Sequence, residues 1–516
     1  MGRSACCGLL LLCLFVLACV ASALWPAADE GAAGGSRYKI AYATYLGGSA
    51  WDQAREVIPG PDGSALIGAQ ACSADMPTTP GAVQGQYAGD DPALGPGGVY
   101  GGDCYLARLS PDGGRLLAAS YFGGSRQERN VYGMALDRQG NVVITSATRS
   151  PDAPTTPGCF QPRYGGGPSD WLVAKLSPDL KKVLWCTYVG GSGDEFPRGG
   201  LALDGEDNVV VVGNTNSANF PTTPGAFARD RRGAEDDAAI VKLQADGSGL
   251  VFSTLLGGSK ADGLMGARVG ASGELYVAGH TQSADFPVTA GAAQRKLGGV
   301  SDIFLAELSK NASQLLYATY LGGRENEFAE HRPFLGQDGT VLVTGVSASP
   351  DFPTTEGAFQ RDLEGQNDGV LAKLSADGKR FLFSTLAGGS GTEFFLMPTP
   401  DESGNIVVVG TTTSADFPVT ADALQKQFGG GGGEGGVAGG DGVLAILSPD
   451  GAELLYATYL GGSGDDLIRS VALGPKGEIY LVGNTSSENF PVTPGALQTK
   501  FGGGTGDAFV VKLVPR

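Results

Sequence analysis

Seven carboxylates recur at one position of a repeated motif, and together they could hold a hard metal ion. Each Gly-Gly pair of the motif is followed, four places after its second glycine, by an aspartate or a glutamate. These residues are Asp52, Glu128, Glu195, Asp262, Glu327, Glu393 and Asp466. Carboxylate oxygens are the ligands that calcium prefers, so a ring of them at one mouth of a channel would suit that ion, the one cofactor considered. The favoured alternative is that each carboxylate accepts N–H bonds in its own turn, because seven anions around one axis would repel one another.

A second recurring carboxylate precedes a short apolar run in each repeat, and we expect it to cap a turn. These residues are Asp103, Asp170, Asp237, Asp302, Asp368, Asp441 and Asp507. One further polar cluster, Glu327, Glu330, His331 and Arg332, lies in the fifth repeat. We expect its histidine to be solvated or satisfied by a neighbouring glutamate rather than catalytic.

Four cysteines remain once those of the first 23 residues are set aside, and they predict local disulfides in an oxidising compartment. They are Cys72, Cys104, Cys159 and Cys186. The preferred pairing joins Cys72 to Cys104 across the base of an enlarged first insert, which leaves Cys159 for Cys186. Free buried thiols are the alternative. A metal cluster is less favoured, because no Cys-x-x-Cys is present and only His280 and His331 could assist.

The elements that position these residues are the strands of a sevenfold repeat. The first glycine of each pair falls at Gly47, Gly123, Gly190, Gly257, Gly322, Gly388 and Gly461, a regular period that marks a repeat architecture. Each unit contains four short apolar runs bounded by turn residues, the pattern of antiparallel strands. The sequence therefore predicts an all-β, seven-bladed β-propeller with four-stranded antiparallel blades.

The phase of the repeat predicts how the ring closes. The repeats begin with a lone outermost strand at 38–46 and finish with the three inner strands of a blade. The N-terminal strand can therefore complete the C-terminal blade, which leaves no unpaired junction. We expect one propeller domain over residues 38–516, after a short linker at 24–37.

Successive antiparallel strands end at alternate faces of the propeller. The two tight turns of each blade are therefore expected on one face, and the long inserts between the second and third strands on the other. Loops on a rigid scaffold are where binding usually resides, so the insert-rich face is the expected recognition surface. A recurring phenylalanine in the inserts is expected to pack each insert onto its blade, whereas a sugar-binding ladder would need exposed rings. These residues are Phe220, Phe286, Phe352, Phe417 and Phe490.

The repeated phrases Phe-Pro-x-Thr-Pro-Gly-Ala, Lys-Leu-Ser-Pro-Asp-Gly and Tyr-Leu-Gly-Gly-Ser resemble the seven-bladed β-propeller (SBBP-type) repeat family of bacterial exported proteins. The strand-Asp-x-x-Gly-Asn-strand core is distantly similar to NHL-type propellers. The resemblance covers essentially the whole chain after the leader. It implies a propeller fold and a cell-surface location, and it brings no established catalytic residues.

The first 23 residues have the pattern of a secretory signal peptide. Arg3 is followed by an apolar run and by the small-x-small sequence Ala21-Ser22-Ala23, which is typical of a cleavage site. We therefore expect export to the periplasm, the cell surface or the medium, with a lipid anchor at Cys19 as the less favoured alternative. No later apolar run is long enough to span a membrane. The net charge of −18 argues against nucleic acid as a partner and suits a soluble monomer.

These features favour a non-catalytic binding or scaffold protein that recognises an extracellular or periplasmic glycan, peptide or protein. A metal-assisted hydrolase or lyase at the mouth of the central channel is the second hypothesis. Passive structural packing in the cell envelope is the third. Fold alone does not decide between them, because propellers carry many functions.

Overall fold

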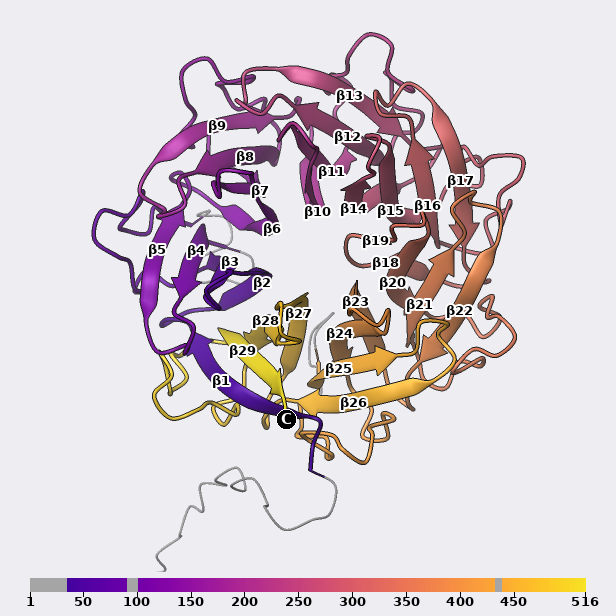
Figure 1. Ribbon diagram of the computed structural model, residues 1–516. Helices are drawn as coiled ribbons and strands as arrows, with labels where there is room; N and C mark the ends of the chain where they lie inside the picture. Colours follow the sequence, from indigo (N-terminus) through magenta and orange to yellow (C-terminus); the bar gives the residue numbers. More distant parts are fainter. Residues whose placement is uncertain (1–34, 91–100, 432–438) are drawn as a thin grey trace, which may run out of the picture. The chain divides into compact units, whose positions relative to one another are not determined.

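The computed structural model describes residues 35–90, 101–431 and 439–516, which form seven four-stranded antiparallel blades around a central axis (Figure 1). The predicted signal peptide and most of the predicted linker fall outside the described residues, as does part of the enlarged first insert. The predicted all-β, seven-bladed fold is confirmed.

The strands of each blade run from the axis outward in chain order. Blade 1 contains β2 (Asp52–Pro59), β3 (Ala65–Ala71), β4 (Asp103–Leu109) and β5 (Leu116–Phe122). Blade 2 contains β6 (Glu128–Leu136), β7 (Val142–Thr148), β8 (Asp170–Leu176) and β9 (Val183–Val189). Blade 3 contains β10 (Glu195–Leu203), β11 (Val209–Thr215), β12 (Asp237–Leu243) and β13 (Leu250–Leu256). Blade 4 contains β14 (Asp262–Val269), β15 (Leu275–Thr281), β16 (Asp302–Leu308) and β17 (Leu315–Leu321).

Blade 5 differs because its innermost strand is divided in two. It contains β18 (Glu327–Ala329), β19 (Phe334–Leu335), β20 (Val341–Ser347), β21 (Asp368–Leu374) and β22 (Phe381–Ala387). Blade 6 contains β23 (Glu393–Pro400), β24 (Ile406–Thr412), β25 (Asp441–Leu447) and β26 (Leu454–Leu460). Blade 7 contains β27 (Asp466–Leu473), β28 (Ile479–Thr485), β29 (Asp507–Pro515) and, from the N-terminal end, β1 (Tyr38–Leu46).

The N-terminal strand closes the ring as the sequence predicts. β1 pairs antiparallel with β29, from Tyr38 opposite Pro515 to Leu46 opposite Ala508. Tyr45 is buried, its hydroxyl donates to the Ser487 carbonyl at 2.7 Å, and its ring lies 6.1 Å from that of Phe490. Chain segments from opposite ends of the sequence therefore share one hydrophobic core.

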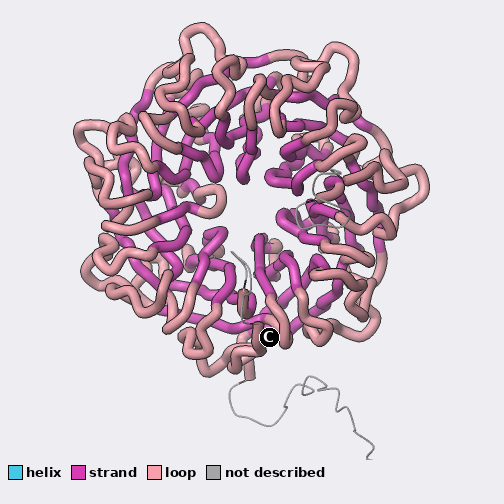
Figure 2. Tube along the Cα trace, turned by 180° about the vertical axis from the view of Figure 1, so that it is seen from behind, coloured by secondary structure: helices cyan, strands magenta, loops and turns pink. Residues whose placement is uncertain are grey.

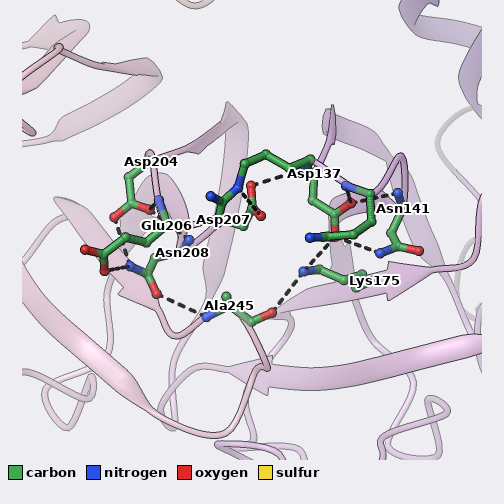
Figure 3. Close-up of polar contacts among 10 residues, drawn as sticks. Asp137, Asn141, Lys175, Asp204, Glu206, Asp207, Asn208 and Ala245 are labelled. Atoms are coloured by element: carbon green, nitrogen blue, oxygen red, sulfur yellow. Dashed lines mark hydrogen bonds and ion pairs between the residues drawn. The ribbon is translucent and has the colours of Figure 1, made fainter.

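The tight turns on one face are held by aspartates and link adjacent blades (Figure 3). In blade 2, Asp137 accepts from the backbone N–H and the side-chain amide of Asn141, at 2.8 Å each. Its carboxylate also pairs with Lys175 at 3.1 Å. The same lysine donates to the Ala245 carbonyl of blade 3 at 3.0 Å. Local turn chemistry and the contact between blades therefore use the same side chains.

The inserts run along the outer rim rather than gathering on one face (Figure 2). The insert of blade 1 starts beside the Gly-Gly link, where Ser49 N–H donates to Asp75 at 2.9 Å. It then lies along β5, with Thr79 N–H donating to the Ala119 carbonyl at 3.1 Å. At the opposite end Val83 N–H reaches the Leu180 carbonyl of blade 2 at 2.9 Å. Each insert thus covers an outer strand edge that would otherwise be free to pair with another chain.

The recurring insert phenylalanines pack inward, as expected. All five are at most 5% exposed, and Phe490 stacks on Phe509 with the ring centroids 4.5 Å apart. The burial of these rings excludes the alternative of an exposed sugar-binding ladder at these positions. The residues are Phe220, Phe286, Phe352, Phe417 and Phe490.

Candidate ligand site in the central channel

The seven recurring carboxylates begin the innermost strands, but their side chains are buried within the ring. Each accepts an N–H bond from the second glycine of its own Gly-Gly pair, as in Gly124 to Glu128 at 2.8 Å and Gly191 to Glu195 at 2.9 Å. Hydroxyl groups add further bonds, such as Thr148 to Glu128 at 2.6 Å. All seven are at most 1% exposed: Asp52, Glu128, Glu195, Asp262, Glu327, Glu393 and Asp466. The structure therefore places them in turn-capping positions rather than in an open ring at a channel mouth.

The second set of aspartates lies against the first set at the blade junctions. Asp103 at the start of β4 accepts from Gln84 Nε2 at 2.7 Å and from Ala88 N–H at 2.8 Å. A Cβ atom on Gly123 would collide with both Asp103 and Glu128, so only glycine leaves room for the two carboxyl groups. We call each such pair a carboxyl clasp. The clasps are Asp103–Glu128, Asp170–Glu195, Asp237–Asp262, Asp302–Glu327, Asp368–Glu393, Asp441–Asp466 and Asp507–Asp52.

Burial gives the clasps unusual protonation behaviour. Burial, and then the neighbouring Glu128, raises the pKa of Asp103 to about 8, and burial raises the pKa of Glu128 to about 7. Burial likewise raises the pKa of Asp170 to about 7. The Oδ1 atom of each of these two aspartates has no hydrogen-bond partner among the described residues. Since two buried carboxylates repel, a clasp near neutral pH is best held with one proton between its two groups.

A calcium site at the seven acids stays a prediction. No group of three or more His, Cys, Asp or Glu side chains suited to a metal ion occurs in the part of the chain that the structure describes. Calorimetric unfolding with and without calcium, after chelation, measures this directly, since an ion that binds the folded state raises the melting temperature.

Replacing Glu195 by alanine is expected to lower the free energy of unfolding by about 1–3 kcal/mol, because Gly191 N–H and Thr215 would lose their buried acceptor. Glu195→Gln keeps one acceptor oxygen and should cost less. Denaturant unfolding measures both. Glu488→Ala, at an exposed position, is the control. An unchanged stability of Glu195→Ala would contradict the turn-capping role.

Within the described residues no disulfide joins Cys72, Cys104, Cys159 or Cys186, so the prediction of local disulfides is wrong for this structure. Cys104 lies opposite Gln70 in the ladder of β3 and β4, which puts Cys72, two residues further on, at a diagonal position with a longer separation. Cys159 lies in a turn held to Cys186 through Thr156, whose N–H donates to the Cys186 carbonyl at 3.1 Å. Burial raises the pKa of the Cys186 thiol, which keeps it protonated and unreactive.

The residues one place after the acids point to the opposite side of the innermost strands, because successive residues of a strand face opposite sides. Four of their side chains are partly exposed: Arg129, Phe196, Phe328 and Phe394. Arg129 lies 4.7 Å from the centre of the Phe196 ring, which belongs to the next blade, and Arg198 lies 5.2 Å from the same ring. The Phe328 ring is 5.2 Å from that of His280. Phe196 and Phe328 keep partial exposure, so cationic and aromatic side chains together form the channel mouth.

Six arginines lie on the innermost strands or, for Arg332, on the link between β18 and β19, in a chain with a net charge of −18. They are Arg55, Arg129, Arg198, Arg268, Arg332 and Arg469, from six of the seven blades. The charge total alone gave no sign of this cluster. One signal was available, because in three repeats an arginine stands three places after the recurring acid, at Arg55, Arg198 and Arg469.

The link between β18 and β19 reaches toward the axis of the ring (Figure 1) and ties blade 5 to blade 1. Arg332 Nη1 donates to both carboxylate oxygens of Glu56 on β2, at 2.9 Å each. The preceding His331 is 2% exposed, and neither ring nitrogen has a hydrogen-bond partner among the described residues. The expectation of a solvated or satisfied histidine is therefore wrong. Burial and the surrounding arginines lower its pKa, which keeps the imidazole neutral.

Comparison with known families adds one match within this architecture. The family model of the SBBP beta-propeller repeat matches residues 455–491, which run from β26 through β28 into the following insert. The chain carries an SBBP beta-propeller repeat. The resemblance inferred from the repeated phrases is thus confirmed. No curated protein matches the chain.

Solved structures show distant likenesses. A protein of unknown function from Dyadobacter fermentans is 11% identical, with 93% of this chain and 100% of that chain covered and a TM-score of 0.41. BamB from Moraxella catarrhalis is 11% identical, with 92% and 99% covered and a TM-score of 0.37. Quinohemoprotein alcohol dehydrogenase from Comamonas testosteroni is 12% identical, with 92% and 76% covered and a TM-score of 0.43. At these scores the likenesses carry no argument about function. Within the described residues no helix has the length and apolar character of a membrane span.

Proposed function

We propose that this protein is an exported, non-catalytic binding propeller that recognises an acidic glycan, peptide or protein at the mouth of its central channel. The observation that carries the proposal is the placement of Arg129 and Arg198 at 4.7 and 5.2 Å from the centre of the Phe196 ring, in a protein that is otherwise strongly acidic. Export is supported by the predicted leader at residues 1–23. The covered outer strand edges of the described residues favour a monomer, because they leave little backbone for pairing with another chain.

Charge and shape both favour an acidic ligand. A cationic patch inside an anionic surface attracts an acidic group to one place and repels it elsewhere. Arginine suits this role because its planar guanidinium binds carboxylate through two parallel bonds and also stacks on aromatic rings. Long nucleic acids are not the expected partners, because the remaining surface would repel a phosphate backbone.

The channel mouth is a better candidate surface than the inserts. The inserts use their backbone groups to cover the outermost strands, as Thr79 does along β5. The channel side chains of Arg198 and Phe196, in contrast, retain solvent access. A rigid ring holds such side chains in place without a further ordering cost, which favours binding.

Titration calorimetry with a polyuronate chain and with polyglutamate tests the proposal, with neutral dextran as the comparison probe. We expect binding of at least one acidic polymer, weakened at least 10-fold by the double substitution Arg129→Met and Arg198→Met. Arg115→Met, at an exposed position away from the channel, should leave binding unchanged. Absence of binding to both polymers, or equal binding by the double variant, would overturn the proposal.

A further inference from the structure

Two polar side chains of the inner ring lie against an aromatic ring of the next blade. In blade 2 the guanidinium of Arg129 lies 4.7 Å from the centre of the Phe196 ring of blade 3. In blade 4 the imidazole of His280 lies 5.2 Å from the Phe328 ring of blade 5. Phe196 and Phe328 each stand one place after the recurring acid of their blade, so the two contacts occupy equivalent positions in the ring, two blades apart.

The two contacts differ in the strand that supplies the polar side chain. Arg129 on the innermost strand of blade 2 stands opposite the small Ala147 on β7. In blade 4 the sizes are exchanged, because Gly263 on the innermost strand stands opposite His280 on β15. A Cβ atom on Gly263 would meet, among the described residues, only Cε1 and Nε2 of His280, both at 3.4 Å. The glycine therefore leaves room for the imidazole to reach the next blade from the second strand.

The His280 ring has unused hydrogen-bonding capacity. Its Nδ1 atom is buried without a partner among the described residues, while the side chain as a whole is partly exposed. Enclosure of the ring, and then the charge of Arg198, lower the pKa of His280 to about 4, so the imidazole is neutral at pH 7. Because no hydrogen bond at Nδ1 fixes the tautomer, Nε2 can either donate or accept. A hydroxyl group fits both forms, whereas a carboxylate can only accept.

We propose that the channel mouth selects a uronate-containing glycan, and that His280 is the residue that recognises a hydroxyl group of the sugar. This inference rests on the proposed function and narrows the acidic ligand of the mouth to the glycan. Arg129 and Arg198 bind the carboxylate beside Phe196, and His280 meets a hydroxyl group beside Phe328.

The aromatic side chains of the mouth favour a sugar over an acidic peptide. Phe196, Phe328 and Phe394 all keep partial exposure, so each offers apolar surface to a ligand. A pyranose ring has an apolar C–H face that packs on such surface, and a rim of hydroxyl groups that remains free for hydrogen bonds. A chain of glutamates carries carboxylates alone and would leave His280 enclosed without a matching partner, which weakens binding.

Titration calorimetry with polygalacturonate and with polyglutamate, matched in the number of carboxylates, tests the inference on the unmodified protein. We expect polygalacturonate to bind at least about 10-fold more tightly, because a hydroxyl contact with His280 adds to the carboxylate contact that both polymers share. Equal or tighter binding of polyglutamate would overturn this inference and leave the proposal for the mouth standing. Absence of binding to both polymers would overturn the two together.

Two variants of His280 show whether this residue makes the distinction. His280→Phe removes both ring nitrogens and keeps an aromatic ring beside Phe328, so it should lower the affinity for polygalacturonate about 10-fold and leave that for polyglutamate unchanged. His280→Gln restores a neutral donor and acceptor and should bind polygalacturonate more tightly than His280→Phe does. Thermal unfolding checks that both variants fold. An unchanged preference for polygalacturonate in folded His280→Phe would overturn the inference.

Discussion

Deletion of residues 1–46 is expected to abolish cooperative unfolding of the ring. The deletion removes β1, exposes the edge of β29 and empties the places of Tyr42, Tyr45 and Leu46 in the core. Loss of Tyr45 alone should cost about 3–5 kcal/mol, the usual range for a large buried aromatic. The remaining six blades would then close around an incomplete junction, which leaves an aggregation-prone edge.

Differential scanning calorimetry compares this deletion with a chain that lacks only residues 1–34, which should melt as the intact protein does. A synthetic peptide of residues 38–46 should restore a cooperative transition to the deletion variant, because β1 binds through backbone ladder bonds and buried side chains. An unchanged cooperative melt after deletion would show that the ring does not depend on β1.

Raising the pH from 5 to 9 is expected to lower the melting temperature by at least about 5 °C through the carboxyl clasps. Burial raises the pKa of Asp103 to about 8 and those of Asp170 and Asp302 to about 7. The same groups titrate near pH 4 in an unfolded chain. Between these values the folded state holds more protons than the unfolded state, so stability is highest below the window and falls as the pH rises through it.

Asp103→Asn separates this effect from general charge repulsion. An amide stays neutral at every pH and can donate to Glu128, so the variant should lose less stability than the parent between pH 5 and 9. Asp230→Asn, at an exposed position, removes the same charge and should keep the parent's pH dependence. A parent stability that rises from pH 5 to 9 would contradict the clasp mechanism.

The blade count and the closing strand could be predicted because both depend on local patterns. Short apolar runs between turn residues mark each strand, and the lone run at 38–46 fixes the phase of the ring. The turn-capping role of Glu195 could also be predicted from the sequence, since acidic side chains often accept N–H bonds in turns. These features require no knowledge of which distant residues meet.

The side chains that come together near the axis of the ring could not be predicted from such local patterns. A single step along a strand changes the side on which a residue lies, so Glu128 is buried in a junction and Arg129 faces the channel. His331 and Arg55 are far apart in the sequence, and Arg55 acts electrostatically on His331 only because the ring closes. The path of the inserts was missed for a similar reason, because their contacts with the next blade depend on the packing of the blades.

The inserts join neighbouring blades on the outside of the ring. Six of the inserts span their own outer strand and bond to a turn of the blade ahead, and the insert of blade 7 does so for blade 1, with Leu497 N–H donating to the Gly113 carbonyl at 2.9 Å. In the described part of the blade 6 insert, Leu424 N–H donates instead to the Tyr456 hydroxyl of its own blade, at 3.3 Å. Each of the six joined blade pairs therefore cannot separate without also breaking an outer insert contact, and we expect the ring to open first between blades 6 and 7.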